Sequence, residues 1–444
     1  MKSRTIFLSA ILLFSLLGSR WGAAQQSTQR QNEVKPPTAD DLVKQGQEAY
    51  NKKEYAKSAQ LLQEAIARGS RSPGVYYDAA CSLALAGDKE NAFRLLNQSI
   101  QAGWRNTEHL KSDGDLTALR EDPRWAKALA ASDARQAKYV KEHSDPGKAR
   151  FLTEDVDRFW KAYDQAMAAA PELRESIFQR EYIDPGTIGL KDFSRSGRLN
   201  AKTLAKVIES RPNFFKAIRQ LTSGIEKQRA ETINAFRKLK QIYPDAIFPH
   251  DYFVIGQLSS GGTASDNGLL MGAEMFTRAA EVPTGELNEW EKGAIMPQSD
   301  IPALVAHESI HFQQKYYAPS GMLCQCLKEG GADFLGELSS GRLIARMRET
   351  HAWANARERE LWEEFQKDME TNKTSRWLYG SSGGNGRPVD LGYWMGYKIS
   401  EAHYKNADDK KLAVQEMLVV NDCKGFLKAS RYAEKFTVAA PAPK

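Results

Sequence analysis

The sequence predicts a mainly α-helical protein with one small sheet, an α+β chain built in two folded parts. Three observations carry this prediction. A 34-residue repeat of small and aliphatic residues runs through residues 40–131, apolar residues at helical spacing dominate residues 151–243, and a β-rich run follows at residues 247–276. With 444 residues, the chain is long enough for two or three domains, each with its own core.

The composition is that of an ordinary globular protein, with 41% hydrophobic residues, 27% charged residues and four cysteines. Disordered, collagen-like and disulfide-scaffold classes are therefore excluded. The formal charge of +6 falls to +3 without residues 1–24, which contain Lys2, Arg4 and Arg20 and no acid. So small a charge gives no support for a nucleic-acid partner.

Residues 1–24 have the features of a cleaved secretory signal peptide: a basic start, an apolar run at residues 5–18 and small residues before Gln25. The run is shorter than a membrane span and Arg20 follows closely, so we expect cleavage rather than anchoring, and no later span. No cysteine lies near the cleavage point, which argues against a lipoprotein. The mature protein is expected to be secreted or periplasmic, with residues 25–39 as a flexible linker.

Export would place the cysteines in an oxidising compartment. Cys81 is expected to be buried in a helix. One bridge is predicted between Cys423 and either Cys324 or Cys326, which are too close together to pair comfortably with each other. Free buried thiols are an equally good interpretation of the same residues.

Residues 40–131 resemble the tetratricopeptide repeat, a helix-turn-helix unit in which small residues stand where two helices cross. The matching pairs, each 34 residues apart, are Gly46 and Ala80, Ser58 and Ala92, Leu62 and Leu96, and Ile66 and Ile100. The repeats are either a docking surface for a protein partner or a packing spacer, and both interpretations stay open. Residues 132–150 are predicted to be a linker, residues 151–436 a second domain, and residues 437–444 a flexible tail.

An H-E-x-x-H motif at residues 307–311 carries the chemistry. Apolar spacing and a capping Asp300 predict that the motif lies inside a helix. Four residues make just over one helical turn, so His307 and His311 project from one face and can bind Zn²⁺ together. Glu308 then lies beside the metal.

A catalytic zinc needs a third protein ligand and an open position. Glu329, 18 residues beyond His311, is the predicted third ligand on a second helix, with Glu337 as a weaker alternative. Asp333, one turn after Glu329, is predicted to accept a hydrogen bond from a ligand imidazole and so fix its tautomer. The small residues 330–332 are expected to let the two helices approach closely.

With these segments the chain resembles the gluzincin class of zinc metallopeptidases, in which a downstream glutamate completes the site. More narrowly, residues 151–435 resemble bacterial zinc-dependent proteases related to the gliding-motility B protein family, through the zinc segments and through residues 252–256, 260–263 and 391–397. The resemblance implies a zincin-like metallopeptidase domain that uses Zn²⁺ to hydrolyse a peptide or protein substrate. It also implies a later Tyr or His that stabilises the oxyanion. Tyr393 is favoured here, although it could equally belong to a packed aromatic stripe.

Two functions follow. The first is an exported zinc metallopeptidase with Glu308 as general base and the repeats as an interaction module. The alternative is a non-enzymatic interaction protein with a structural or silent zinc site, closed by Cys324 or Cys326 as a fourth ligand. Residues 252–256 are expected to form either an edge strand that pairs with the substrate or an internal strand. His403 is expected at the surface or at a helix cap.

Overall fold

The computed structural model describes residues 37–315, 321–371, 374–379 and 386–437. The predicted signal peptide at residues 1–24 lies outside the described residues, as do residues 25–36 of the predicted linker and residues 438–444 of the predicted tail. The described chain is mainly helical with one four-stranded sheet, so the predicted α+β class is confirmed. It divides into two compact units between Arg135 and Gln136, each with its own hydrophobic core.

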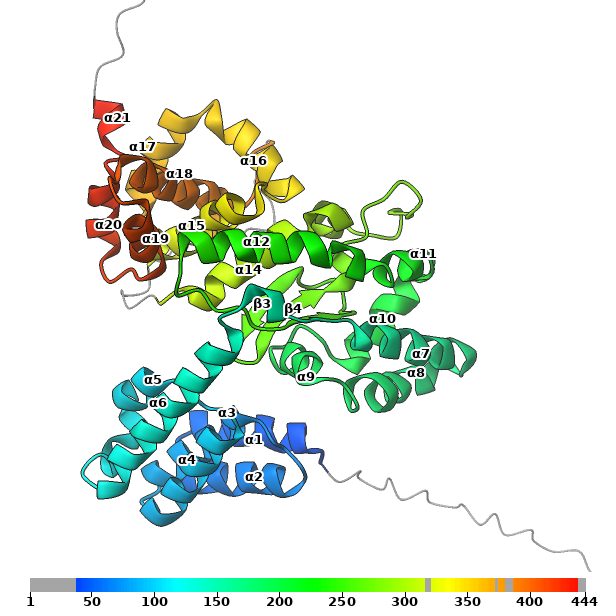
Figure 1. Ribbon diagram of the computed structural model, residues 1–444. Coiled ribbons are helices and arrows are strands. Elements are labelled where there is room, and N and C mark those ends of the chain that lie inside the picture. Colours follow the sequence, from blue (N-terminus) through cyan, green and yellow to red (C-terminus); the bar gives the residue numbers. More distant parts are fainter. Residues whose placement is uncertain (1–36, 316–320, 372–373, 380–385, 438–444) are drawn as a thin grey trace, which may run out of the picture. The chain divides into compact units, whose positions relative to one another are not determined.

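The first unit is a series of helices, of which the first four pack each on the next along the chain (Figure 1). Its helices are α1 (Ala39–Asn51), α2 (Tyr55–Ala67), α3 (Pro73–Leu85), α4 (Lys89–Ala102), α5 (Thr107–Ser112) and the first part of α6 (Pro123–His143). Gly46 marks the crossing of α1 and α2, because a Cβ atom there would lie 2.8 Å from Cγ of Leu62. Leu62 and Leu96, which are 34 positions apart, are both buried in this core.

Helix α6 continues through much of the segment that the sequence favours as a linker. It is helical to His143, and Asp145 then caps a short 3-10 turn at Pro146–Lys148 before strand β1 (Phe151–Leu152). The polar composition of residues 132–143 therefore reflects a largely exposed helix rather than an irregular connection.

The second unit opens with a series of helices, some of which pack against the sheet. They are α7 (Glu154–Ala168), α8 (Arg174–Ile177), the π-helical turn η4 (Phe178–Ile183), α9 (Ile188–Arg195), α10 (Ala201–Ser210), α11 (Pro212–Thr222) and α12 (Arg229–Ile242). Aromatic rings fill the space between α7, η4 and α11, with Phe159 at the centre of contacts to Phe178, Tyr182 and Phe215. The Tyr182 hydroxyl donates to the carbonyl of Ile255 at 2.7 Å, which fastens η4 to the end of the central strand.

The sheet has the strand order β1-β2-β4-β3. Strand β2 (Asp251–Val254) runs parallel to β1 and to β4 (Gly268–Gly272), whereas β3 (Gly262–Ser265) is antiparallel to β4 and forms an edge. Residues 252–256 thus begin in an internal strand, which decides between the two interpretations left open above. Neither β3 nor the two-residue β1 was predicted as a strand of its own.

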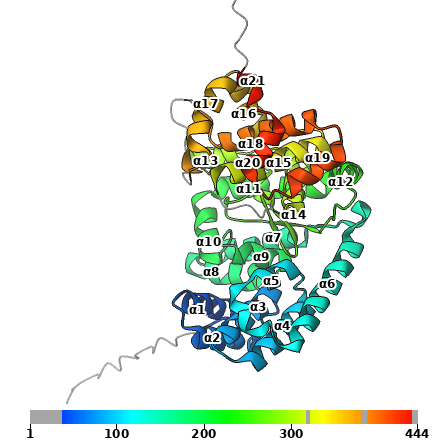
Figure 2. The same cartoon turned by 90° about the vertical axis from the view of Figure 1, so that its left-hand side faces the viewer.

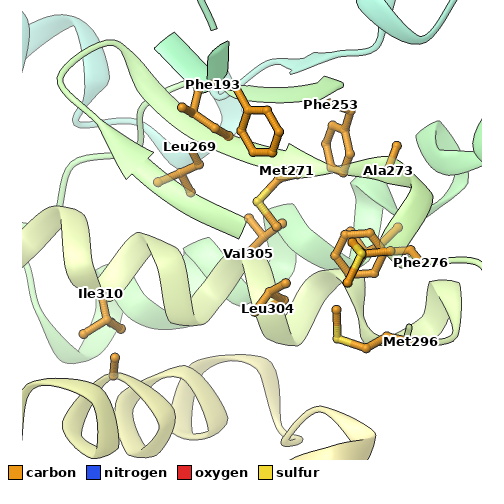
Figure 3. Close-up of a cluster of buried hydrophobic side chains, with 14 of the residues drawn as sticks. Phe193, Phe253, Leu269, Met271, Ala273, Phe276, Met296, Leu304, Val305 and Ile310 are labelled. Atoms are coloured by element: carbon orange, nitrogen blue, oxygen red, sulfur yellow. The ribbon is translucent and has the colours of Figure 1, made fainter. Parts of the chain in front are cut away.

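Helix α14 (Ile301–Gln313) packs against β3 and β4, and α15 (Met322–Ser340) packs against α14. Figure 3 shows Val305 of α14 beside Met271 of β4, and Leu304 close to Met296. Nearly every residue of α14 is buried, because the sheet lies on one side and α15 on the other.

The helices that follow α15 complete the second unit, and several of them contact α15 (Figure 2). They are α16 (Ala345–Asn355), α17 (Glu358–Asp368), α18 (Leu391–Asn406), α19 (Lys410–Leu418), α20 (Cys423–Ser430) and α21 (Glu434–Thr437). A disulfide joins Cys324 of α15 to Cys423 of α20, so the predicted bridge uses Cys324. Cys81 and Cys326 are buried free thiols. None of the described helices combines the length and the apolarity needed to cross a membrane.

Candidate metal centre

Helix α14 carries the H-E-x-x-H motif, as the sequence predicts. Asp300 occupies the N-cap position, but its side chain makes no capping bond to α14. It instead accepts the backbone N–H of Ala345 at 2.6 Å and thereby caps the start of α16. The predicted cap residue is therefore placed correctly but serves a neighbouring helix, which ties the beginnings of α14 and α16 together.

Helix α15 brings Glu329 and Asp333 to the motif, and two glycines of α15 set its position. A Cβ atom on Gly336 would lie 3.2 Å from the backbone nitrogen of His307, so α15 approaches α14 there. Gly330 faces α18 instead, where a Cβ atom would lie 2.1 Å from the backbone nitrogen of Tyr397. The sequence predicts that residues 330–332 let α15 approach α14 closely. For Gly330 this prediction is wrong, because Gly330 faces α18.

Three side chains from the two helices converge on one point. Nε2 of His311 lies 3.0 Å from Nε2 of His307 and 3.1 Å from Oε2 of Glu329, and Nε2 of His307 lies 3.8 Å from the same oxygen. The side chains of His307, His311 and Glu329 are only 11%, 15% and 12% exposed. One oxygen or nitrogen atom from each lies within 4.8 Å of the others, as a shared metal ion requires.

The outer nitrogen of each imidazole is held by a separate acceptor. Nδ1 of His307 lies 2.8 Å from Oδ1 of Asp333, and Nδ1 of His311 lies 2.7 Å from Oε1 of Gln314. Each Nδ1 therefore donates a proton, so the Nε2 atom of each ring faces the cluster and can bind a metal ion when the ring is neutral. Two imidazole nitrogens and a carboxylate oxygen thus face one another, and a cation such as Zn²⁺ that displaces the protons fits this donor set.

Asp333 lies where the sequence places it, whereas Gln314 was not predicted. Gln314 stands one turn after His311, and its amide also donates to the carbonyl of Lys328 at 2.8 Å. It thus links the end of α14 to the residue before Glu329. The sequence feature that could have indicated this role is an amide side chain three residues after a ligand histidine.

The local charges favour a positive ion. Burial lowers the pKa of His307, but the carboxylates of Asp333, Glu308 and Glu329 outweigh it and raise this pKa to about 9. Burial raises the pKa of Glu329, yet the hydrogen bond from His311 and the charges of both imidazoles bring it down to about 2. The centre is therefore rich in negative charge, which a bound cation would neutralise.

Neither cysteine near the motif is available as a fourth ligand. Cys324 is in the disulfide, and Cys326 packs against α18, where a Cβ atom on Gly392 would lie 2.7 Å from its Sγ. Glu337, the alternative third ligand, accepts the hydroxyl of Tyr397 and is absent from the three-residue cluster. The described donors therefore leave a coordination position open, as in catalytic rather than structural zinc sites.

The centre opens into a cavity of about 430 Å³. Its wall includes His307, Glu308, Asp333, the glycines that begin β3, and an apolar group formed by Met275, Met296, Ala303 and Leu304. Glu308 is buried, which raises the pKa of its carboxyl group. A Cβ atom on Gly262 would lie 2.9 Å from Oε1 of Glu308, so only glycine lets β3 lie this close to the acid.

Two tyrosines line the same cavity. Tyr393, predicted from the sequence, stands in the first turn of α18 with its ring 6.3 Å from that of His307. Tyr379, which was not predicted, places its hydroxyl 3.3 Å from Oε1 of Glu329. His403 is buried rather than exposed, and its Nε2 pairs with Glu416 at 2.8 Å.

A second group of metal-binding side chains, Cys81, Asp113 and Asp115, lies in the first unit. The hydroxyl of Tyr77 donates to Asp113 at 2.6 Å, and that of Tyr50 donates to Asp115 at 2.5 Å. These hydroxyl donors satisfy the acids, so this group needs no ion.

One protein-family model matches most of the second unit. Residues 151–434 match the model of the family described as gliding motility protein GldB. No curated protein and no solved structure matches the chain. Because the matched segment is more than half of the 444 residues and contains every residue of the candidate metal centre, the chain belongs to the gliding motility protein GldB family.

Proposed function

We propose that this protein is an exported zinc metallopeptidase of the gluzincin type. The observation that carries the proposal is the convergence of His307, His311 and Glu329 beside a buried Glu308, which lines a cavity together with His307. A set of two imidazoles and one carboxylate, with no fourth protein ligand among the described residues, is the arrangement of hydrolytic zinc sites.

The metal ligands and Glu308 have different roles in the proposed reaction. A bound Zn²⁺ ion would lower the pKa of water and polarise a carbonyl group. Glu308 is the general base, which takes a proton from the attacking water and returns it to the amine nitrogen as the C–N bond breaks. Burial, which raises the pKa of Glu308, suits a group that must both accept and release a proton near neutral pH.

Strand β3 is the best candidate to bind the substrate backbone. It forms an edge of the sheet, its four residues are partly exposed, and Gly261 and Gly262 at its start line the cavity beside Glu308. An extended peptide that pairs with this edge would pass the general base directly. The substrate strand is thus β3 rather than residues 252–256.

For the first unit we propose a tetratricopeptide array that binds a protein partner or part of the substrate. The 34-residue spacing, the glycine at the crossing of α1 and α2, and the stepwise packing of the helices support this assignment.

The proposed compartment is the cell envelope, on the secreted or periplasmic side. The family model carries a lipoprotein label, and the Cys324–Cys423 disulfide fits an oxidising compartment.

The test is the zinc content and casein hydrolysis of the purified protein, of Glu308→Gln and of His311→Ala, with His109→Ala of the first unit as the histidine control. We expect one zinc per chain in the wild type, in Glu308→Gln and in the control, and loss of zinc in His311→Ala. Hydrolysis should fall by about a thousandfold or more in Glu308→Gln. Full activity of Glu308→Gln would refute the mechanism, and zinc without hydrolysis in the wild type would favour the non-enzymatic alternative.

A further inference from the structure

We propose that Tyr379 supplies the hydroxyl that holds the substrate's carbonyl oxygen during hydrolysis, and that Asp390 and Arg346 position it. This inference rests on the proposed peptidase function. It replaces the assignment that the sequence favours, Tyr393, with a residue from a segment that no motif marks.

The position of the Tyr379 hydroxyl is the first argument. It lies 3.3 Å from Oε1 of Glu329, while the other oxygen of the same carboxylate, Oε2, faces the two imidazoles. The Tyr379 residue is 63% exposed, whereas the Glu329 side chain is 12% exposed. The exposed tyrosine therefore lines the cavity, and its hydroxyl reaches a carboxylate oxygen of the metal cluster.

The backbone around Tyr379 is the second argument. Tyr379 and Asp390 both have left-handed backbone conformations, with φ of 58° and 59°. This conformation is costly for a tyrosine, so it persists only where neighbouring contacts enforce it. Such strain gathers at binding and catalytic sites.

Two hydrogen bonds enforce this conformation. The backbone N–H of Tyr379 donates to Oδ1 of Asp390 at 2.8 Å, and Arg346 donates to Oδ2 of the same carboxylate at 3.0 Å. Immediately before Tyr379, Trp377 and Leu378 are fully buried, and the Trp377 carbonyl accepts the N–H of Gly392 at 2.7 Å. Tyr379 is thus exposed, but its backbone is held by Asp390 and by the buried residues that precede it.

Tyr393 lacks this arrangement. It belongs to α18, and its ring lies nearly parallel to that of His307, with 20° between the planes. Because α18 packs against α15, Tyr393 is held in place as part of the cavity wall. Tyr379 instead has its hydroxyl on a carboxylate oxygen, a partner that it can exchange for another oxygen.

The chemistry asks for a hydrogen-bond donor only. As water adds to the carbonyl carbon, negative charge grows on the carbonyl oxygen, and a hydroxyl that shifts from Glu329 to this oxygen stabilises the charge. No bond to Tyr379 forms and no proton leaves it. Removal of one such donor costs about 10² to 10³ in kcat.

The experiment compares zinc-loaded wild type with Tyr379→Phe, Tyr393→Phe and, as a matched control outside the cavity lining, Tyr404→Phe. We expect Tyr379→Phe to lower kcat by about 10² to 10³ while KM changes less than about threefold. Its affinity for a phosphinic peptide, whose tetrahedral phosphorus resembles the transition state, should fall by a similar factor. Its affinity for a peptide of the same sequence with an ordinary amide should stay within about threefold of the wild type.

Zinc affinity, measured by chelator competition, separates this role from simple support of Glu329. If Tyr379→Phe weakens zinc binding and regains full activity at saturating zinc, the hydroxyl serves the metal ligand alone and the inference is overturned. Larger losses in Tyr393→Phe than in Tyr379→Phe overturn it as well. If the wild type hydrolyses nothing, the proposed function fails, and the phosphinic peptide still decides the point: equal affinity in wild type and Tyr379→Phe, or no binding to either, rejects the role of Tyr379.

The positioning residues have a test of their own. Asp390→Ala should lower kcat by about tenfold, because it releases the backbone of Tyr379. Combined with Tyr379→Phe, it should cost nothing further, since both changes remove the same hydroxyl from its place. Additive losses in the double variant would show that Asp390 acts independently of Tyr379.

Discussion

Asp333 holds His307 through one carboxylate oxygen, and its other oxygen is buried without a hydrogen-bond partner among the described residues. The residue therefore acts on the metal centre chiefly through the imidazole. We expect Asp333→Ala to weaken zinc binding by about 10- to 100-fold, because His307 loses the acceptor that fixes its tautomer. Asp333→Asn, which keeps an acceptor oxygen but not the charge, should cost less.

Chelator competition at fixed pH measures this effect. Glu337→Gln, one turn further along α15 and bonded to Tyr397, is the control, and it should leave zinc affinity within about threefold of the wild type. Equal losses in Glu337→Gln and Asp333→Ala would contradict a specific role for Asp333.

A residue of the site can be predicted from the sequence when its position depends only on its neighbours along the chain. His307, Glu308 and His311 are fixed by helix geometry alone, and Glu329 and Asp333 share a face of one further helix. Gln314 and Tyr379 reach the site from a helix end and a later loop, and their contacts exist only after the chain has folded. Periodicity carries no signal for such contacts, and the same reason left open which cysteine pairs with Cys423.

Helices α15 and α18 meet at backbone distance, which makes glycine obligatory on both. A Cβ atom on Gly330 would lie 2.1 Å from the backbone nitrogen of Tyr397, and one on Gly396 would lie 1.7 Å from the carbonyl oxygen of Cys326. We expect Gly330→Ala to lower the free energy of unfolding by about 3 kcal/mol or more, since one helix must move.

Urea unfolding of metal-free protein tests this expectation. Gly293→Ala in α13 (Glu289–Ala294) is the matched control, because nothing lies within 4 Å of its added Cβ atom. The control should be neutral or stabilising by about 0.5 to 1 kcal/mol, as for a helical glycine replaced by alanine. If both variants unfold alike, α15 and α18 are not in the contact described.

A buried carboxylate secures the segment between β2 and β3. Glu274 accepts the backbone N–H groups of Gly256 at 2.8 Å and Leu258 at 3.2 Å, and burial raises its pKa to about 7. Because the folded state holds this proton more tightly than the unfolded chain, the stabilisation is complete below pH 4.5. It is lost as pH rises through 7, by up to about 3 kcal/mol.

We therefore expect the free energy of unfolding of Glu274→Gln, followed by urea titration with chelator present, to lack this decline between pH 4.5 and 7. The exposed residue Glu281 provides the control substitution, Glu281→Gln, which should keep the wild-type slope. An unchanged slope in Glu274→Gln would assign the pH dependence to other groups.

At the scale of helices and strands, the long helices could be predicted from the sequence, whereas the sheet could be predicted only in part. Residues 247–255 and 269–276 contain the apolar runs of β2 and β4, which are buried on all positions. Strand β3 has the sequence Gly-Thr-Ala-Ser, with weak strand propensity, and only its pairing with β4 makes it a strand. Sequence patterns therefore gave no indication of β3, the edge strand that we propose binds the substrate.

At the scale of the molecule, the described residues form two hydrophobic cores that share no residue, one in each compact unit. Calorimetry of the metal-free protein should therefore resolve two unfolding transitions. Zinc should raise the midpoint of one alone, with a stabilisation of about 4 kcal/mol at a free concentration a thousandfold above its Kd. In His311→Ala the shift should vanish, and a single transition that moves as a whole would show that the units unfold together.

The disulfide between Cys324 and Cys423 spans 99 residues of sequence. Since a chain is made from its N-terminus, the helix that carries Glu329 lacks this covalent link until Cys423 has been synthesised. A chain cut short before Cys423 would keep both histidines and the glutamate but lose this link. The order of synthesis thus places the covalent link of the metal-binding helix after the synthesis of every predicted metal ligand.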